Sequence, residues 1–102
     1  MKPYKKQIFI AHPHPIVAIS LEYLIEGEKD LVVCGKACDY NETLKLISKS
    51  NPDLAVVDIF MNNGHKCIVA DVRKESSSLP ILVVSELDES LYLVNANRKF
   101  MR

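Results

Sequence analysis

Short apolar runs alternate with helix-patterned segments along most of this 102-residue chain. The strand-like runs each hold five mainly apolar positions, and they are residues 7–11, 31–35, 54–58 and 81–85. The segments between them carry apolar residues at helical spacing, and they are residues 16–25, 39–48 and 67–74. Strands and helices in alternation form right-handed βαβ crossovers and a parallel sheet that is covered on both faces. The pattern therefore predicts an α/β fold with a doubly wound parallel sheet.

Punctuating residues place the ends of the first two helices. Pro15 suits the first turn of a helix, where a missing N–H costs nothing, and Gly27 suits the helix end, where a left-handed residue is often required. Asp39 and Glu42 have the spacing of a capping box, so the second helix is expected to open there.

The charge balance limits the classes of partner. Thirteen basic residues offset thirteen acidic ones, and the basic residues are scattered, so we expect no direct binding to nucleic acid. The apolar run behind the N-terminal lysines is broken at His12-Pro13, which is too early for a signal peptide or a membrane span. We therefore expect one cytoplasmic domain over residues 1–102, without a membrane partner.

The cysteines do not form a disulfide framework or a metal motif. Cys34, Cys38 and Cys67 are an odd set, and no two of them have CxxC spacing. We expect reduced and mostly buried thiols, with Cys34 and Cys67 in the core.

Asp58 closes the strand-like run at 54–58 and is the principal candidate for chemistry. In open α/β sheets, ligands bind outside the carboxyl ends of the parallel strands, where this carboxylate is expected to lie. An Asp in this place can also cap the following helix. Position alone leaves both roles open.

Several motifs, taken in order, resemble the response-regulator receiver domain of the NarL/LuxR type. They are Ile8 to Ala11, His14-Pro15-Ile16-Val17, Pro52-Asp53-Leu54 through Asp58, Met61, and Leu79-Pro80 through Ser85. The resemblance implies the flavodoxin-like strand order 2-1-3-4 and a role in two-component signal transduction. It makes Asp58 the candidate phosphoacceptor from a sensor histidine kinase and Ser85 the switch hydroxyl.

The family's Mg²⁺ site is altered here. Receivers hold Mg²⁺ with an acidic pair after the first strand, the phosphoacceptor, and the backbone carbonyl two residues later, which here is Phe60. His12 and Pro13 stand at the acidic-pair positions. Three carboxylates therefore fall to one, and a hard cation loses its preferred oxygen ligands. We expect Mg²⁺ binding at Asp58 and Phe60 to be weak or lost.

The C-terminal end also departs from the family. A fourth helix is expected to open at Asp88 or Glu89 and to end near Asn97, with Tyr92 on its partner-facing surface. Beyond it, the fifth strand is missing or rudimentary and the fifth helix is absent, so we expect a receiver-like domain that is incomplete at this end. A sheet face without its helix exposes several hundred Å² of apolar surface, and a homodimer is one way to cover it.

Three functions remain open at this point. The first is a phosphoaccepting receiver, and the second is a pseudoreceiver that acts as a protein-interaction module without phosphorylation. The third is transition-metal binding by His12, His14 and Asp58, because imidazole and carboxylate are suitable ligands. No order of Ser, His and Asp or of Cys and His indicates a hydrolase, so we do not expect an enzyme.

Overall fold

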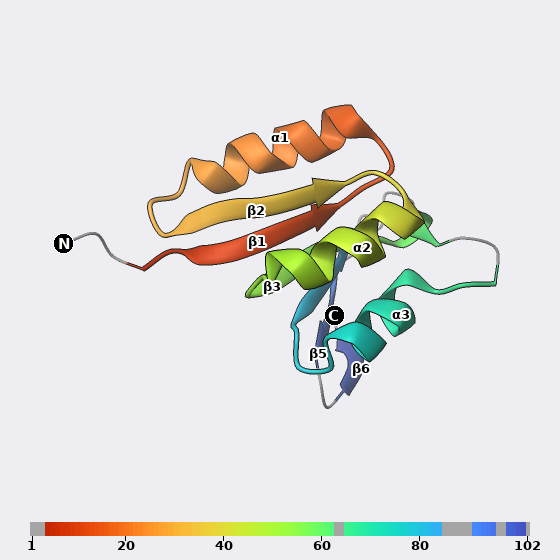
Figure 1. Ribbon diagram of the computed structural model, residues 1–102. Coiled ribbons are helices and arrows are strands. Elements are labelled where there is room, and N and C mark those ends of the chain that lie inside the picture. Colours follow the sequence, from red (N-terminus) through yellow and green to blue (C-terminus); the bar gives the residue numbers. More distant parts are fainter. Residues whose placement is uncertain (1–3, 63–64, 85–90, 96–97, 102) are drawn as a thin grey trace.

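The computed structural model describes residues 4–62, 65–84, 91–95 and 98–101. Its first elements alternate as predicted, and they are β1 (Lys6–Ala11), α1 (Pro15–Glu26), β2 (Leu31–Ala37), α2 (Tyr40–Ser50), β3 (Leu54–Asp58), the 3₁₀ turn η1 (Ile59–Met61), α3 (Ile68–Glu75) and β4 (Ile81–Val84). The four strands are parallel and lie in the order β2-β1-β3-β4, which confirms the doubly wound prediction. Figure 1 shows α1 on one side of this sheet and α2 and α3 on the other.

The end of the sheet differs from the expectation. Two further strands follow β4, namely β5 (Leu91–Asn95) and β6 (Arg98–Met101), and each is antiparallel to the strand before it. The predicted fourth helix is therefore wrong, because β5 lies within its expected range, and β6 lies where a missing or rudimentary fifth strand was expected. The run Leu91-Tyr92-Leu93-Val94 explains this, because four consecutive apolar residues lack the polar face of a surface helix and suit a paired strand.

The predicted helix ends hold in part. Pro15 begins α1, and Asp39 caps α2 by accepting a hydrogen bond from the Glu42 backbone N–H at 2.7 Å. Gly27 follows α1 with a right-handed φ of −70°, so the expected left-handed exit is not used there. Asn51 takes that conformation instead, with a φ of 50° after α2, which Asn tolerates better than most residues.

The core lies between the two central strands and the helices α2 and α3. The last four residues of β1 and of β3 are buried, as expected of parallel strands that are covered on both faces. Gly35 in β2 is needed for close packing, because a Cβ at this position would lie 2.8 Å from the ring of Phe9 and from the hydroxyl of Ser50. Cys34 packs partly buried against this core, whereas Cys67 is exposed and the expectation of a core thiol there is wrong.

None of the helices in the described part of the chain has both the length and the apolar character that crossing a membrane requires.

Candidate functional site

The parallel register of β1 and β3 brings His12 and Asp58 together. Ala11 pairs with Val57, so the residues that follow them in the chain meet at the carboxyl edge of the sheet. Nε2 of His12 lies 3.1 Å from Oδ2 of Asp58. Both residues are buried, with 2% and 1% of their surfaces exposed. The site is thus a buried pair of an imidazole and a carboxylate on two neighbouring strands.

The second ring nitrogen of His12 is also engaged. Its Nδ1 accepts a hydrogen bond from the backbone N–H of His14 at 3.1 Å. The ring of His14 itself is exposed, 5.6 Å from the ring of His12 between centroids and tilted by 48°. His12 is therefore held from both sides, by the turn that leads into α1 and by the end of β3.

The arrangement does not suit a cluster of metal ligands. The nitrogen lone pair of His12 that a metal would need accepts a backbone hydrogen bond, and the other nitrogen faces Asp58. Among the residues that the structure describes, no three His, Cys, Asp or Glu side chains gather as a possible metal site. Nothing in these contacts favours the transition-metal hypothesis for His12, His14 and Asp58.

The same residues do not fit Mg²⁺ either. Pro13 offers no side-chain ligand, and His12 places an imidazole nitrogen against the carboxylate that would have to bind the cation. Mg²⁺ favours a nearly ideal octahedron of oxygen ligands. Of the expected donors, only the Asp58 carboxylate and the backbone carbonyl of Phe60, within η1, are oxygen ligands.

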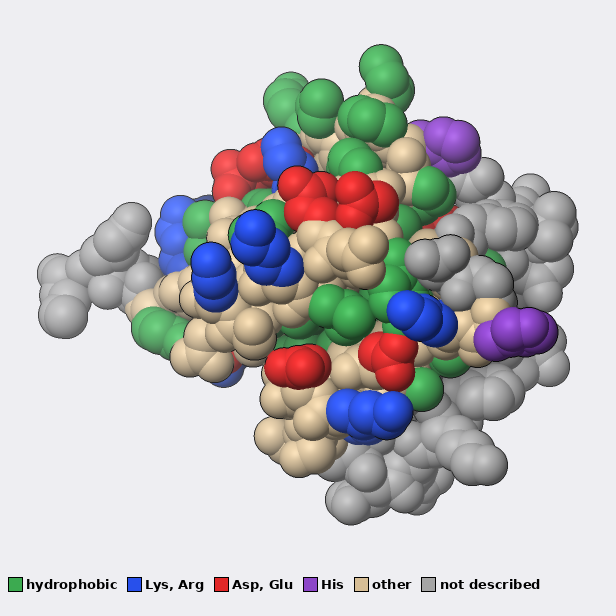
Figure 2. Space-filling model, turned by 45° about the vertical axis from the view of Figure 1, so that its right-hand side comes forward, with side chains coloured by type: hydrophobic (Ala, Val, Ile, Leu, Met, Phe, Trp, Pro, Cys, Tyr) green, Lys and Arg blue, Asp and Glu red, His purple; other side chains and the backbone are tan. Residues whose placement is uncertain are grey.

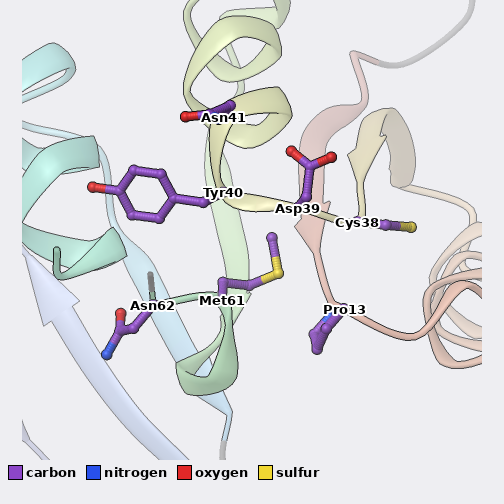
Figure 3. Close-up of a pocket in the computed structure, with 7 residues that line it drawn as sticks. All are labelled: Pro13, Cys38, Asp39, Tyr40, Asn41, Met61 and Asn62. Atoms are coloured by element: carbon purple, nitrogen blue, oxygen red, sulfur yellow. The ribbon is translucent and has the colours of Figure 1, made fainter. Parts of the chain in front are cut away.

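A pocket of about 380 Å³ opens at the carboxyl edge of the sheet, and neither His12 nor Asp58 lines it. Its lining comes from the segments after β1, β2 and β3, including the first turn of α2, and consists of Pro13, Cys38, Asp39, Tyr40, Asn41, Met61 and Asn62. Figure 3 shows Pro13 facing this space, while the ring of Tyr40 points away from it toward α3. Nothing in the sequence pattern signals this pocket, because it depends on how three loops pack.

The remaining candidate residues lie apart from the pair or outside the described structure. Tyr92 is in β5, opposite Val83 of β4, and so is not on a helix. Ser85 lies outside the described residues. Asp53, at the other end of β3, was not singled out as a functional group, yet its Oδ2 accepts the backbone N–H of Gln7 at 2.8 Å.

One face of the molecule is unusually apolar. Large side chains of α1 are exposed there, and they are Ile16, Ile19, Tyr23 and Leu24. Figure 2 shows hydrophobic side chains gathered over α1 at the top of the view. Exposed apolar patches of this kind commonly mark contact surfaces.

A parallel sheet of order β2-β1-β3-β4, with a buried carboxylate at the end of its third strand, defines a flavodoxin-like domain of the receiver class. The sequence model of one protein family, the response regulator receiver domain, matches residues 8–100, and the chain belongs to this family. It is therefore a receiver domain of two-component signalling, a class of domain that is generally not itself an enzyme.

Three similar proteins illustrate the family. The chain is 26% identical over 102 residues to the uncharacterized transcriptional regulatory protein YxjL of Bacillus subtilis, covering 96% of this chain and 45% of that protein. It is 27% identical over 79 residues to protein-glutamate methylesterase/protein-glutamine glutaminase 4 of Geobacter metallireducens, covering 78% and 23%. The solved signal receiver domain of NarL from Mycobacterium tuberculosis is 27% identical, with a TM-score of 0.73 over 85% of this chain and 71% of that one.

These matches confirm the resemblance to receivers, including one from NarL. The chain spans less than half the length of the two whole-protein relatives.

Proposed function

We propose that this chain serves two-component signalling as a pseudoreceiver, read through protein contacts and without Mg²⁺-dependent phosphorylation of Asp58. His12 occupies a position where the family has an acidic residue. The observation that carries the proposal is that its imidazole lies 3.1 Å from the Asp58 carboxylate. A cytoplasmic location, where a sensor kinase would reach the domain, is part of the same proposal.

The chemistry of phosphoryl transfer gives the reason. A carboxylate attacks an anionic phosphoryl group slowly unless a cation neutralises the charge and holds the transferring oxygens. Around Asp58, the expected acidic ligands are replaced by His12 and Pro13, and the carboxylate is buried. Weak or lost Mg²⁺ binding removes the means by which the family activates this step.

A second candidate function keeps Asp58 as the phosphoacceptor, with Ser85 as the switch hydroxyl and a sensor histidine kinase as the donor. Two observations favour it. Asp58 occupies the carboxyl end of β3, where the fold places reactive groups, and the pocket lined by Pro13, Met61 and Asn62 opens at the same edge of the sheet. In this case His12 must move away before a phosphoryl group can be accommodated.

The apolar face of α1 supports a homodimer as the contact that the proposal requires. Ile16, Ile19 and Tyr23 follow the i, i+3, i+7 spacing of a helix-packing seam, and Tyr23 is 80% exposed. Sedimentation velocity is expected to show a dimer that Tyr23→Glu dissociates. Lys45→Glu, on the exposed surface of α2, is the matched control and leaves the dimer intact.

Phosphorylation distinguishes the two candidate functions. The folded protein is incubated with acetyl phosphate, with and without Mg²⁺, and its intact mass is measured beside a receiver of known activity and the variant Asp58→Asn. The proposed pseudoreceiver gives no phosphoryl adduct under conditions in which the control receiver is modified. An Mg²⁺-dependent adduct that Asp58→Asn abolishes would overturn it and establish the phosphoacceptor.

A further inference from the structure

The buried carboxylate of Asp58 needs a compensating partner. An ionised carboxylate that is removed from water is costly unless a hydrogen-bond donor or a positive charge faces it. Asp58 is 1% exposed, and Nε2 of His12 lies 3.1 Å from its Oδ2. The protonation pattern of this imidazole therefore decides whether it helps or opposes burial of the carboxylate.

The backbone of the turn before α1 determines that pattern. An amide N–H can only donate, so Nδ1 of His12, 3.1 Å from the backbone nitrogen of His14, must present its lone pair. A neutral imidazole carries a single proton, which consequently sits on Nε2. This is the nitrogen that faces Asp58.

We infer that His12 is a positioning residue for Asp58, a proton-bearing internal partner whose tautomer is fixed by the backbone N–H of His14. This role deepens the proposed pseudoreceiver function and rests on it. The partner is built into the chain, so the buried carboxylate faces the imidazole of His12 in the absence of a cation. The tautomer also presents Nε2–H rather than a lone pair toward the site, so His12 cannot serve as a metal ligand there.

The first test is nuclear magnetic resonance of the ¹⁵N-labelled full chain, with long-range correlations that distinguish the two ring nitrogens of each histidine. His12 is expected with its proton on Nε2 and a lone pair on Nδ1, as the contact with the His14 backbone N–H requires. The exposed rings of His14 and His65 are internal references for solvent-averaged signals. His14→Ala is the matched control, because it removes the neighbouring ring and keeps the backbone N–H, and the signature of His12 is expected to persist.

The second test separates donation from packing. His12→Gln retains an amide N–H donor near the position of Nε2, whereas His12→Leu fills a similar volume without a donor. The thermal unfolding midpoint of the Gln variant is expected to stay within a few degrees of the wild type, and that of the Leu variant to fall by roughly 5 °C or more. Equal midpoints for the two variants would contradict the inference.

The outcomes also separate this inference from the proposed function. A ring protonated on Nδ1, or one that exchanges freely between tautomers, overturns the role of His12 whatever the phosphorylation assay gives. An Mg²⁺-dependent phosphoryl adduct with the Nε2–H tautomer intact overturns the pseudoreceiver and the claim that His12 takes the place of a cation, while it upholds the tautomer itself.

Discussion

The two carboxylates at the ends of β3 have different kinds of partner. Asp53 precedes the strand, and its Oδ2 accepts the backbone N–H of Gln7 at the start of β1. Asp58 ends the strand, and its Oδ2 faces the side chain of His12 just beyond β1. The backbone N–H at position 7 is present for any residue except proline, whereas the imidazole at position 12 is lost when His12 is substituted. The carboxyl edge of this sheet is therefore the end that can change its chemistry while the fold persists.

The largest expected effect comes from truncating the side chains of the two partner residues in turn. His12→Ala is expected to lower the free energy of unfolding by about 2 kcal/mol, because it leaves a buried carboxylate without its imidazole. Gln7→Ala keeps the backbone donor to Asp53 and is expected to cost less than about 0.5 kcal/mol. Urea denaturation of both variants measures the difference. Similar losses would show that the two ends of β3 do not differ in this way.

Asp53 itself gives the next largest effect. Asp53→Ala removes the acceptor for the Gln7 N–H and is expected to cost about 1.5 kcal/mol, as for a hydrogen bond to a charged group. Asp53→Asn keeps an acceptor oxygen and is expected to lose less than half of that. If the two variants were equally destabilised in urea, the charge of Asp53 rather than its hydrogen bond would dominate.

Asp39 extends the comparison to a third carboxylate. Its Oδ1 accepts the backbone N–H of Glu42 at the start of α2, so it belongs with Asp53. Asp39→Ala is expected to cost about 1 kcal/mol, and Asp39→Asn close to nothing, since both Asp and Asn are good N-caps. Thermal unfolding monitored by circular dichroism gives both values, and a large loss with Asn would place Asp39 in a different class.

The smallest expected effect is electrostatic and is felt at Cys34. Burial raises the pKa of the Cys34 thiol above its ordinary value, and the negative charge of Asp53 raises this pKa further. Asp53→Asn should lower the pKa, increase the thiolate fraction at a given pH, and speed alkylation of Cys34 by about twofold. Peptide mass spectrometry after timed iodoacetamide treatment measures this rate, with the exposed Cys67 as the internal reference. An unchanged ratio of the two rates would show that the charge of Asp53 does not raise the pKa of Cys34.

The parallel part of the fold could be predicted because its signals are local. Residues 8–11 in β1 and 54–57 in β3 are apolar, as expected of strands covered on both faces, and Pro15 begins α1 while Asp39 caps α2. The helix expected after β4 is wrong, because the four consecutive apolar residues at 91–94 lack a polar face and form most of β5.

The site was predictable as a position and not as a set of contacts. Asp58 and the substituted positions His12 and Pro13 can be identified in the sequence. The strand register then places His12 beside Asp58. The tautomer of His12 depends on the backbone direction at His14, and the bond of Asp53 depends on a side-chain rotamer. Neither the tautomer of His12 nor the hydrogen bond of Asp53 can be predicted from the spacing of residues in the sequence.

Titration with Mg²⁺ tests the central claim most directly. The thermal unfolding midpoint is measured across millimolar Mg²⁺ for the wild type, for Asp58→Asn, and for the double variant His12→Asp/Pro13→Asp, which restores the acidic pair. The account predicts no saturable shift for the wild type and a saturable rise for the double variant, because binding to the native state stabilises it. A saturable rise in the wild type that Asp58→Asn abolishes would show that His12 does not exclude the cation.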